Sequence, residues 1–308
     1  MGRGRPGKDK MGPFAVTRKQ EPDLGPTGRT RPNSGADRAQ PLLEVHNLWC
    51  GYGRHTALKG ISFRVAPGEI IGVLGPNGAG KSTLLLAAGG ILPLRSGEIR
   101  LLGSPLSQWK PKERARRMAA LNQDCDVRLP FPCGEVVLMG RYPHQEFFRT
   151  NGIRDATAVQ WALDRTDTTE LADRLITEVS GGERQSVIMA RALAQQAPLL
   201  LLDEATSAMD IHRKLKIFQG LERLNREENL TILAALHDVN LAALFCRRLI
   251  MLKNGEILAD GETRSVLRPE ILENVYGTPA VIQEIKEIER LQVFFLPSGE
   301  TSKGNGDG

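Results

Sequence analysis

The stretch GPNGAGKSTLLLAAGG, Gly75–Gly90, decides the fold of this chain, and it directly follows the aliphatic run Ile70–Leu74. An aliphatic run of that length is typical of a buried strand, and the Leu- and Ala-rich end of the stretch is typical of a helix. A tight strand-to-helix turn would explain the glycines but not the lysine. The loop fits the pattern G-x-x-x-x-G-K-[ST], whose backbone N–H groups, lysine and hydroxyl hold nucleotide phosphates and Mg²⁺, at Gly75, Gly80, Lys81 and Ser82.

Length and composition set the class of protein. The chain has 308 residues, of which 41% are hydrophobic, enough for one large domain with its own core. No run of 18 or more apolar residues occurs, so we expect a soluble chain whose contact with a membrane depends on a partner. The four cysteines form no C-x-x-C pair, which favours a reducing compartment and no structural zinc.

The net charge of +5 is concentrated at the amino end. Residues 1–40 hold nine Lys and Arg against four Asp and Glu, so the rest of the chain is neutral and offers no footprint for nucleic acid. This segment is rich in Gly and Pro, and we predict a disordered basic tail, although Met11 could equally be the start of the protein. Residues 297–308 are predicted to be a disordered C-terminal tail.

The order of elements between the tails predicts one domain, residues 41–296. Strand patterns at 42–50, 61–65 and 97–103 predict a small antiparallel sheet beside the nucleotide core. Residues 133–177 change to charged helical periodicity, so we predict a helical insertion over about 124–178.

Acidic residues follow two further apolar strands. LLLLDE at 199–204 and TILAALHD at 231–238 are continuous apolar runs, which predict a parallel sheet with functional residues at the carboxyl ends of its strands. Asp203 is placed to hold Mg²⁺, and Glu204 to orient or deprotonate an attacking water. Ahead of these two strands, Ser180 and Glu183 have capping-box spacing and predict a helix that starts at Ser180.

The motifs together resemble those of the ATP-binding subunit of ABC transporters. Their order is GPNGAGKST, Gln123, VSGGE at 179–183, LLLLDEAT at 199–206, SAMD at 207–210 and His237, and the resemblance covers roughly Leu42–Tyr276. It implies an α/β fold: a P-loop NTPase core with a parallel sheet, an N-terminal antiparallel β subdomain and an inserted α-helical subdomain. It also implies that ATP and Mg²⁺ are the cofactors and that the activity is ATP hydrolysis.

The resemblance assigns roles residue by residue. It implies a metal site at Ser82, Gln123 and Asp203, catalytic roles for Glu204, His237 and Gln123, and an adenine contact at Tyr52. Trp49 is an alternative to Tyr52, and both could instead be packed core aromatics. Val179 and Glu183 depart from the usual Leu and Gln of the signature loop. The remaining nucleotide contacts implied are Gly75, Pro76, Asn77, Gly78, Ala79, Gly80, Lys81, Ser82, Thr83, Ser180, Gly181, Gly182, Glu183 and Asp210.

The resemblance also implies partners. They are a second copy of the chain, integral-membrane permease subunits and, indirectly, an extracytoplasmic substrate-binding protein, with the ATPase on the cytoplasmic face of the inner membrane. The strings GRYPH at 140–144 and PEILENVYG at 269–277 resemble the branch that serves ferric siderophore, haem and cobalamin importers, and Tyr142 and Phe147 are the expected permease anchors. The alternatives are an importer ATPase for another cargo and a non-transport ABC ATPase acting on nucleic acid or ribosomes.

Overall fold

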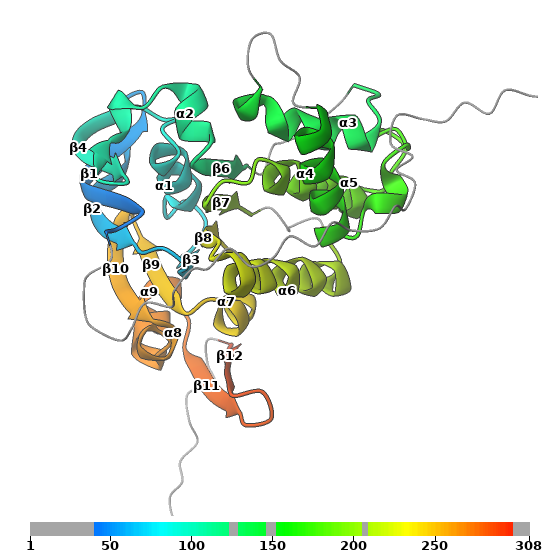
Figure 1. Cartoon of the computed structure of the whole chain (residues 1–308). Coiled ribbons are helices and arrows are strands. Elements are labelled where there is room, and N and C mark those ends of the chain that lie inside the picture. The colour runs from blue at the N-terminus through cyan, green and yellow to red at the C-terminus, as the bar shows by residue number, and fades with distance from the viewer. Residues whose placement is uncertain (1–39, 123–128, 146–151, 205–208, 298–308) are drawn as a thin grey trace, which may run out of the picture. The chain divides into compact units, whose positions relative to one another are not determined.

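A six-stranded sheet forms the centre of the folded region. The computed structural model describes residues 40–122, 129–145, 152–204 and 209–297. The strand order is β10-β9-β3-β8-β7-β6, and all neighbours run parallel except β10, which is antiparallel to β9 (Figure 1). The strands are β3 (Ile70–Leu74), β6 (Met118–Leu121), β7 (Leu199–Asp203), β8 (Thr231–Ala235), β9 (Arg248–Lys253) and β10 (Glu256–Glu262). The parallel core is therefore confirmed, with one antiparallel strand added at its edge.

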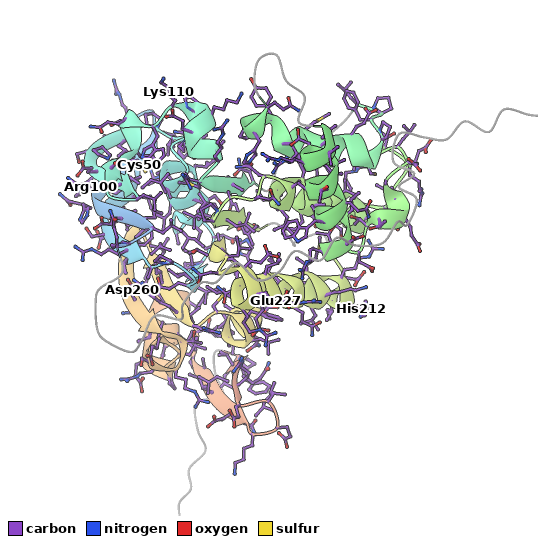
Figure 2. All side chains as sticks on the ribbon, in the orientation of Figure 1. Cys50, Arg100, Lys110, His212, Glu227 and Asp260 are labelled. Atoms are coloured by element: carbon purple, nitrogen blue, oxygen red, sulfur yellow. The ribbon has the colours of Figure 1, made fainter. Side chains whose placement is uncertain are left out.

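Each face of this sheet packs into its own apolar core. Side chains alternate along a strand, so Leu199 and Leu201 of β7 enter one core, and Leu200 and Leu202 enter the other. The first core is shared with helix α1 (Lys81–Ala88), and the second with several helices, including three that follow the signature segment or a core strand. These are α5 (Gly181–Ala194), α6 (Ile211–Glu228) and α7 (Val239–Phe245). His212 and Glu227 mark the two ends of α6 in Figure 2.

The antiparallel subdomain lies on the same side of the sheet as α1. Its strand order is β2-β1-β4-β5, and its buried residues belong to the core that contains α1. The hairpin of β1 and β2 turns at Gly53 and Arg54, as the glycine-rich sequence predicts. The elements are β1 (Leu43–Tyr52), β2 (His55–Val65), β4 (Leu94–Leu101) and β5 (Ser104–Pro105), followed by the 3₁₀ helix η1 (Leu106–Gln108) and helix α2 (Pro111–Ala115).

A helical lobe follows β6, as expected from its sequence, and it packs against α5. It contains α3 (Cys133–Leu138), η2 (Met139–His144), α4 (Gly152–Arg165) and η3 (Thr169–Leu171), shown in green in Figure 1. Gly140 lets η2 approach α5 closely, because a Cβ at that position would lie 2.1 Å from the carbonyl oxygen of Arg191. Close packing of this kind makes the lobe and α5 one structural unit.

The C-terminal part of the fold was not foreseen from the sequence. Helices α8 (Thr263–Val266) and α9 (Pro269–Tyr276) are followed by a hairpin of β11 (Ala280–Ile285) and β12 (Arg290–Phe295), which forms a separate two-stranded sheet. Strand β12 packs against α7. Within the described ranges, no helix is both long and apolar enough to cross a bilayer.

Candidate nucleotide-binding site

The phosphate loop joins the end of β3 to the start of α1 and has the conformation that its glycines permit. Gly75 has φ +150° and Gly80 has φ +104°, both values that side chains disfavour. A Cβ at Gly75 would lie 2.2 Å from the carbonyl oxygen of Leu252, and one at Gly80 would lie 2.6 Å from Leu58 Cδ2. The loop is therefore closely packed on its protein side, and it directs the first backbone N–H groups of α1 toward a ligand.

Lys81 is folded back onto this loop. Its Nζ donates hydrogen bonds to the carbonyl oxygens of Gly75 (2.9 Å) and Pro76 (3.2 Å), and only 5% of the residue is exposed. Burial lowers the pKa of Lys81, while the charges of Glu204 and Asp203 act in the opposite direction. Within the described residues, the hydrogen bonds of this buried ammonium go to carbonyl oxygens, so it is well placed to bind phosphate oxygens, which carry full charge.

Asp203 closes β7 and meets the start of α1. Ser82 Oγ donates a hydrogen bond of 2.9 Å to Asp203 Oδ1, although 121 positions separate the two residues in the chain. Burial raises the pKa of Asp203, and the Ser82 hydrogen bond lowers it in part. The structure therefore brings together one hydroxyl oxygen and one carboxylate oxygen, which are the ligand types that suit Mg²⁺.

Glu204 and His237 meet at the ends of neighbouring strands. Glu204 has a left-handed backbone (φ +48°), and its N–H donates to the carbonyl oxygen of Ala235 at 3.2 Å. Its carboxylate pairs with His237 Nε2, and the side chains are 9% and 45% exposed, respectively. A positive φ is uncommon for a residue with a side chain, and such strained residues are enriched at active sites. The sequence predicted the two residues but not their contact.

The signature segment, Ser180–Glu183, begins α5 with the predicted capping box. The Ser180 N–H donates to the Glu183 carboxylate at 2.8 Å, and the Glu183 N–H donates to Ser180 Oγ at 3.3 Å. Arg213 adds a hydrogen bond of 3.4 Å to Glu183, and its own N–H is capped by Asp210 at 2.8 Å. These contacts lower the pKa of Glu183, with the hydrogen bonds from Ser180 as the largest cause.

The signature segment and the phosphate loop do not meet within this chain. Among the hydrogen bonds and ion pairs of the described residues, none joins residues 180–183 to residues 75–83. Asp210 makes its contacts with Arg213 and none with the phosphate loop in that part of the chain. The structure thus brings together the phosphate loop, Asp203, Glu204 and His237, and leaves the signature segment apart from them.

The predicted aromatic contacts are exposed. Tyr52 is 52% exposed and Trp49 is 38% exposed, so neither is a packed core aromatic. Trp49 Nε1 donates to Asn47 Oδ1 at 3.2 Å, whereas Tyr52 ends β1 beside the turn. Gln123 lies outside the described residues, as does Phe147.

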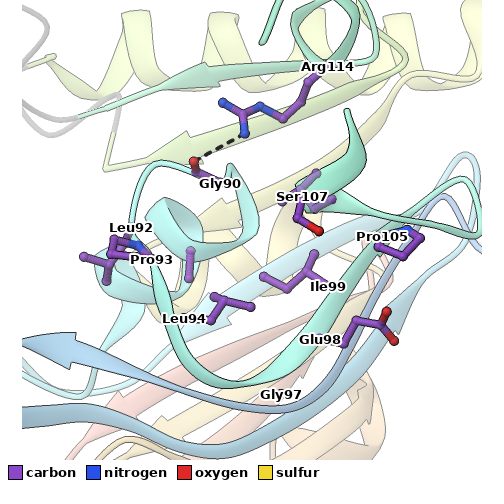
Figure 3. A pocket seen from close by; sticks show the side chains of 12 residues that line it. Gly90, Leu92, Pro93, Leu94, Gly97, Glu98, Ile99, Pro105, Ser107 and Arg114 are labelled. Atoms are coloured by element: carbon purple, nitrogen blue, oxygen red, sulfur yellow. Dashed lines mark hydrogen bonds between the residues drawn. The ribbon is translucent and has the colours of Figure 1, made fainter. Parts of the chain in front are cut away.

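A separate hollow lies away from these residues. It has a volume of about 490 Å³ and is lined by the end of α1, by β4 and by η1 (Figure 3). Arg114 borders it and donates to the carbonyl oxygen of Gly90 at 3.3 Å. Its other lining residues are apolar or glycine apart from Glu98 and Ser107, and it includes no residue assigned to nucleotide binding or hydrolysis.

A parallel sheet with a phosphate loop at one strand end and acidic residues at another defines a P-loop nucleotide-binding protein. The family model described as "ABC transporter" matches residues 58–207. Over 79% of its length this chain is 41% identical to the hemin import ATP-binding protein HmuV of Myxococcus xanthus, covering 92% of that relative. The chain belongs to the ATP-binding proteins of ABC transporters, which are ATPases.

Other relatives and solved structures agree with this family. The chain is 38% identical to the iron(3+)-hydroxamate import ATP-binding protein FhuC of Bacillus subtilis, covering 78% of this chain and 89% of that one. It is also 38% identical to the cobalamin import ATP-binding protein BtuD of Halobacterium salinarum, and the match covers 78% of this chain and 60% of that protein.

A metal-chelate type ABC transporter solved in an inward-facing conformation has a TM-score of 0.72 at 30% identity, covering 84% of this chain and 98% of that chain. A dimeric bacterial ABC transporter cassette has a TM-score of 0.66 at 28% identity, and the match covers 72% of this chain and 99% of that chain. These similarities confirm the predicted fold: a P-loop core, an antiparallel β subdomain and a helical insertion.

Proposed function

We propose that this chain is the ATP-hydrolysing subunit of an ABC importer for a ferric siderophore, haem or cobalamin. One observation supports a site for hydrolysis. Lys81, the Ser82–Asp203 hydrogen bond and the Glu204–His237 pair all lie at the same edge of the sheet. The cargo class rests on the relatives, which are named for hemin, iron(3+)-hydroxamate and cobalamin import. We assign residues 41–296 to the ATPase domain and about 124–178 to its helical insertion.

In the proposed mechanism, residues 75–83 hold the phosphates of ATP through backbone N–H groups and Lys81. Ser82 and Asp203 would hold Mg²⁺, with Gln123 as a further ligand, and the metal would neutralise charge on the β- and γ-phosphate oxygens. Glu204 accepts a proton from the attacking water, and His237 orients Glu204 through the contact between their side chains. Tyr52 is exposed at the end of β1, where it could stack on adenine.

We further propose that two copies of the chain complete the site. The signature segment begins α5 but does not meet the phosphate loop of its own chain, and a structural relative is a dimeric cassette. In such a dimer, Ser180, Gly181 and Gly182 would bind the γ-phosphate held by the partner, and Glu183 would hold the segment through Ser180 and Arg213. Asp210 would face the same interface.

Membrane partners complete the proposal. The relatives' names describe import, so we propose that permease subunits hold this ATPase at the cytoplasmic face of the membrane, and that an extracytoplasmic protein delivers the cargo. A deletion strain should lose uptake of a ferric siderophore, haem or cobalamin. Normal uptake of all three, with failure on a sugar or amino acid, would reject the cargo class and leave the ATPase assignment intact.

The nucleotide site is tested with the purified chain. The parent should release phosphate from ATP with Mg²⁺ but not with excess EDTA. Lys81→Ala should weaken ATP binding, measured with a fluorescent analogue, because the buried ammonium that contacts the phosphates is lost. Lys110→Ala, which changes an exposed lysine outside the site, is the matched control and should bind as the parent does. Unchanged affinity in Lys81→Ala would contradict the assignment of the phosphate loop.

A further inference from the structure

The C-terminal hairpin, β11 and β12, is bound to both ends of α7. Asn240, in the first turn of α7, donates from Nδ2 to the carbonyl oxygen of Val293 at 3.1 Å and accepts from the Val293 N–H at 2.7 Å. At the other end, Arg290 Nε donates to the carbonyl oxygen of Leu244 at 2.9 Å. The Asn240 side chain therefore satisfies both backbone groups of one residue in β12, as a neighbouring strand would.

Helix α7 begins directly after His237. Asp238 caps the helix by accepting hydrogen bonds from the N–H groups of Asn240 (2.9 Å) and Leu241 (3.0 Å). Only two residues, Asp238 and Val239, separate His237 from Asn240 in the chain. The helix has seven residues, and helices this short are not stable without tertiary contacts. Where α7 begins, and hence where His237 lies, therefore depends on what α7 packs against.

The hairpin is itself held by the body of the domain. Val293 is 3% exposed and belongs to the main apolar core. A guanidinium nitrogen of Arg264 in α8 lies 2.6 Å from Glu284 Oε1 in β11. The ring of Phe295 packs edge-on against that of Tyr276 in α9, with 5.3 Å between the ring centres. Because a two-stranded hairpin has little stability of its own, these contacts are what make it a fixed support for α7.

We propose that Asn240 is a positioning residue for hydrolysis, which acts by fixing the start of α7 against β12 and so placing His237 against Glu204. This inference rests on the proposed function of His237 and Glu204. It assigns the C-terminal hairpin a role in the ATPase site, although the hairpin supplies no residue to that site. Binding of ATP depends on the phosphate loop, so loss of the Asn240 contacts should slow hydrolysis more than it weakens ATP binding.

Asn225 provides a matched control. It is 5% exposed, and its Nδ2 also donates to two backbone carbonyl oxygens, those of Gly68 (2.8 Å) and Leu230 (2.7 Å). Gly68 and Leu230 precede β3 and β8, so Asn225 lies at the opposite edge of the sheet from His237. Asn225→Ala removes a similar set of hydrogen bonds without reaching the proposed site.

The experiment compares steady-state hydrolysis by the full chain in the parent, Asn240→Ala and Asn225→Ala. We expect kcat to fall about tenfold in Asn240→Ala, with KM for ATP within about twofold of the parent, because small displacements of catalytic groups cost this much or more. Both variants should melt at a lower temperature, but Asn225→Ala should keep the parent's kcat. Equal kcat in the three proteins would overturn the proposal, whereas a parent that fails to hydrolyse ATP would overturn the proposed function.

Two further variants test whether Asn240 acts through His237. In a His237→Ala background, single-turnover hydrolysis with enzyme in excess should show no additional loss from Asn240→Ala, and fully additive losses would contradict the proposal. Arg290→Ala removes the second hairpin contact to α7 and should lower kcat in the same direction. If Asn240→Ala fails to fold, an unchanged kcat in Arg290→Ala would count against the role of the hairpin.

Discussion

Glu204 combines an unusual backbone with a nearly buried carboxylate. Its φ of +48° and its side-chain contact with His237 fix the direction of the carboxylate at the end of β7. We predict that Glu204→Gln loses most ATP hydrolysis but still binds ATP, because the amide cannot accept the proton of the attacking water while the phosphate loop is unchanged. Phosphate release and ATP binding, measured on the same preparation, distinguish the two effects. Turnover equal to that of the parent would remove Glu204 from the mechanism.

Asp203 lies in the proposed site, and its buried carboxylate should lower the stability of the folded protein at neutral pH. Burial raises its pKa, so the folded state binds its proton more tightly than the unfolded state does. The ordinary pKa of an Asp carboxyl is about 3.9, and below this pH the contribution of Asp203 to the free energy of unfolding is fully present. The contribution is lost as the pH rises from there through the pKa of Asp203 in the folded state.

We predict that Asp203→Asn raises the melting temperature by about 2–4 °C at pH 7, with hydrolysis lost, because the change removes a buried charge. The gain should shrink as the pH falls and approach zero below about pH 3, where Asp203 of the parent is protonated in both the folded and the unfolded state. Melting curves of the parent and the variant at several pH values measure this difference. A variant less stable than the parent at pH 7 would contradict the stated cause of the shift.

At the scale of elements, the string GRYPH has a structural basis that its sequence did not show. Arg141 is only 6% exposed, and its hydrogen bonds hold η2 in place. It donates to Asp155 of α4 at 2.9 Å and to the carbonyl oxygen of Ala194, at the end of α5, at 2.7 Å. The string thus joins two helical elements of the lobe, η2 and α4, to α5.

We predict that Arg141→Met destabilises the protein by about 3–5 kcal/mol, because it leaves the buried Asp155 carboxylate without its partner. The double variant Arg141→Met/Asp155→Leu should recover much of that loss. Denaturant unfolding gives the free energies of all three proteins. The matched single change Arg100→Met breaks an exposed pair with Glu98 and should leave the free energy of unfolding close to that of the parent.

Tyr142 differs from its neighbours in this string because it is 70% exposed. The Lys112 ammonium lies 5.7 Å from the centre of its ring, so a cation–π contact holds the ring while most of the side chain stays exposed. We predict that Tyr142→Ala lowers cargo uptake per ATP hydrolysed, because exposed aromatic side chains are common anchors of protein contacts. Uptake and ATP consumption measured together in membrane vesicles give this ratio. A ratio equal to that of the parent would exclude Tyr142 as a permease contact.

At the scale of the whole molecule, the proposed function has a second copy of the chain complete the site. We predict that Glu204→Gln with ATP forms a stable homodimer, since the signature segment of each copy would close on ATP that is not hydrolysed. Light scattering should show the mass of a dimer with ATP and of a monomer without it. Ser180→Arg in the same background should restore the monomer. The arginine side chain is larger than that of serine and would occupy the space in which the signature segment would bind the partner's γ-phosphate. Monomers alone at saturating ATP would contradict the dimer.

The sequence by itself determined the local features of this protein. The glycines and lysine of residues 75–83, the apolar runs that form β3, β7 and β8, and the capping box at Ser180 depend on neighbours in the chain, so their spacing predicted them. The tertiary structure decided what distant segments do together. It placed Ser82 against Asp203 and Glu204 against His237, it used Arg141 as a buried clamp, and it set the C-terminal hairpin against α7. Such contacts depend on strand order and packing, because residues far apart in the chain meet only when the fold brings their elements together: at the strand ends of the sheet for the first two contacts, and between packed elements for the others.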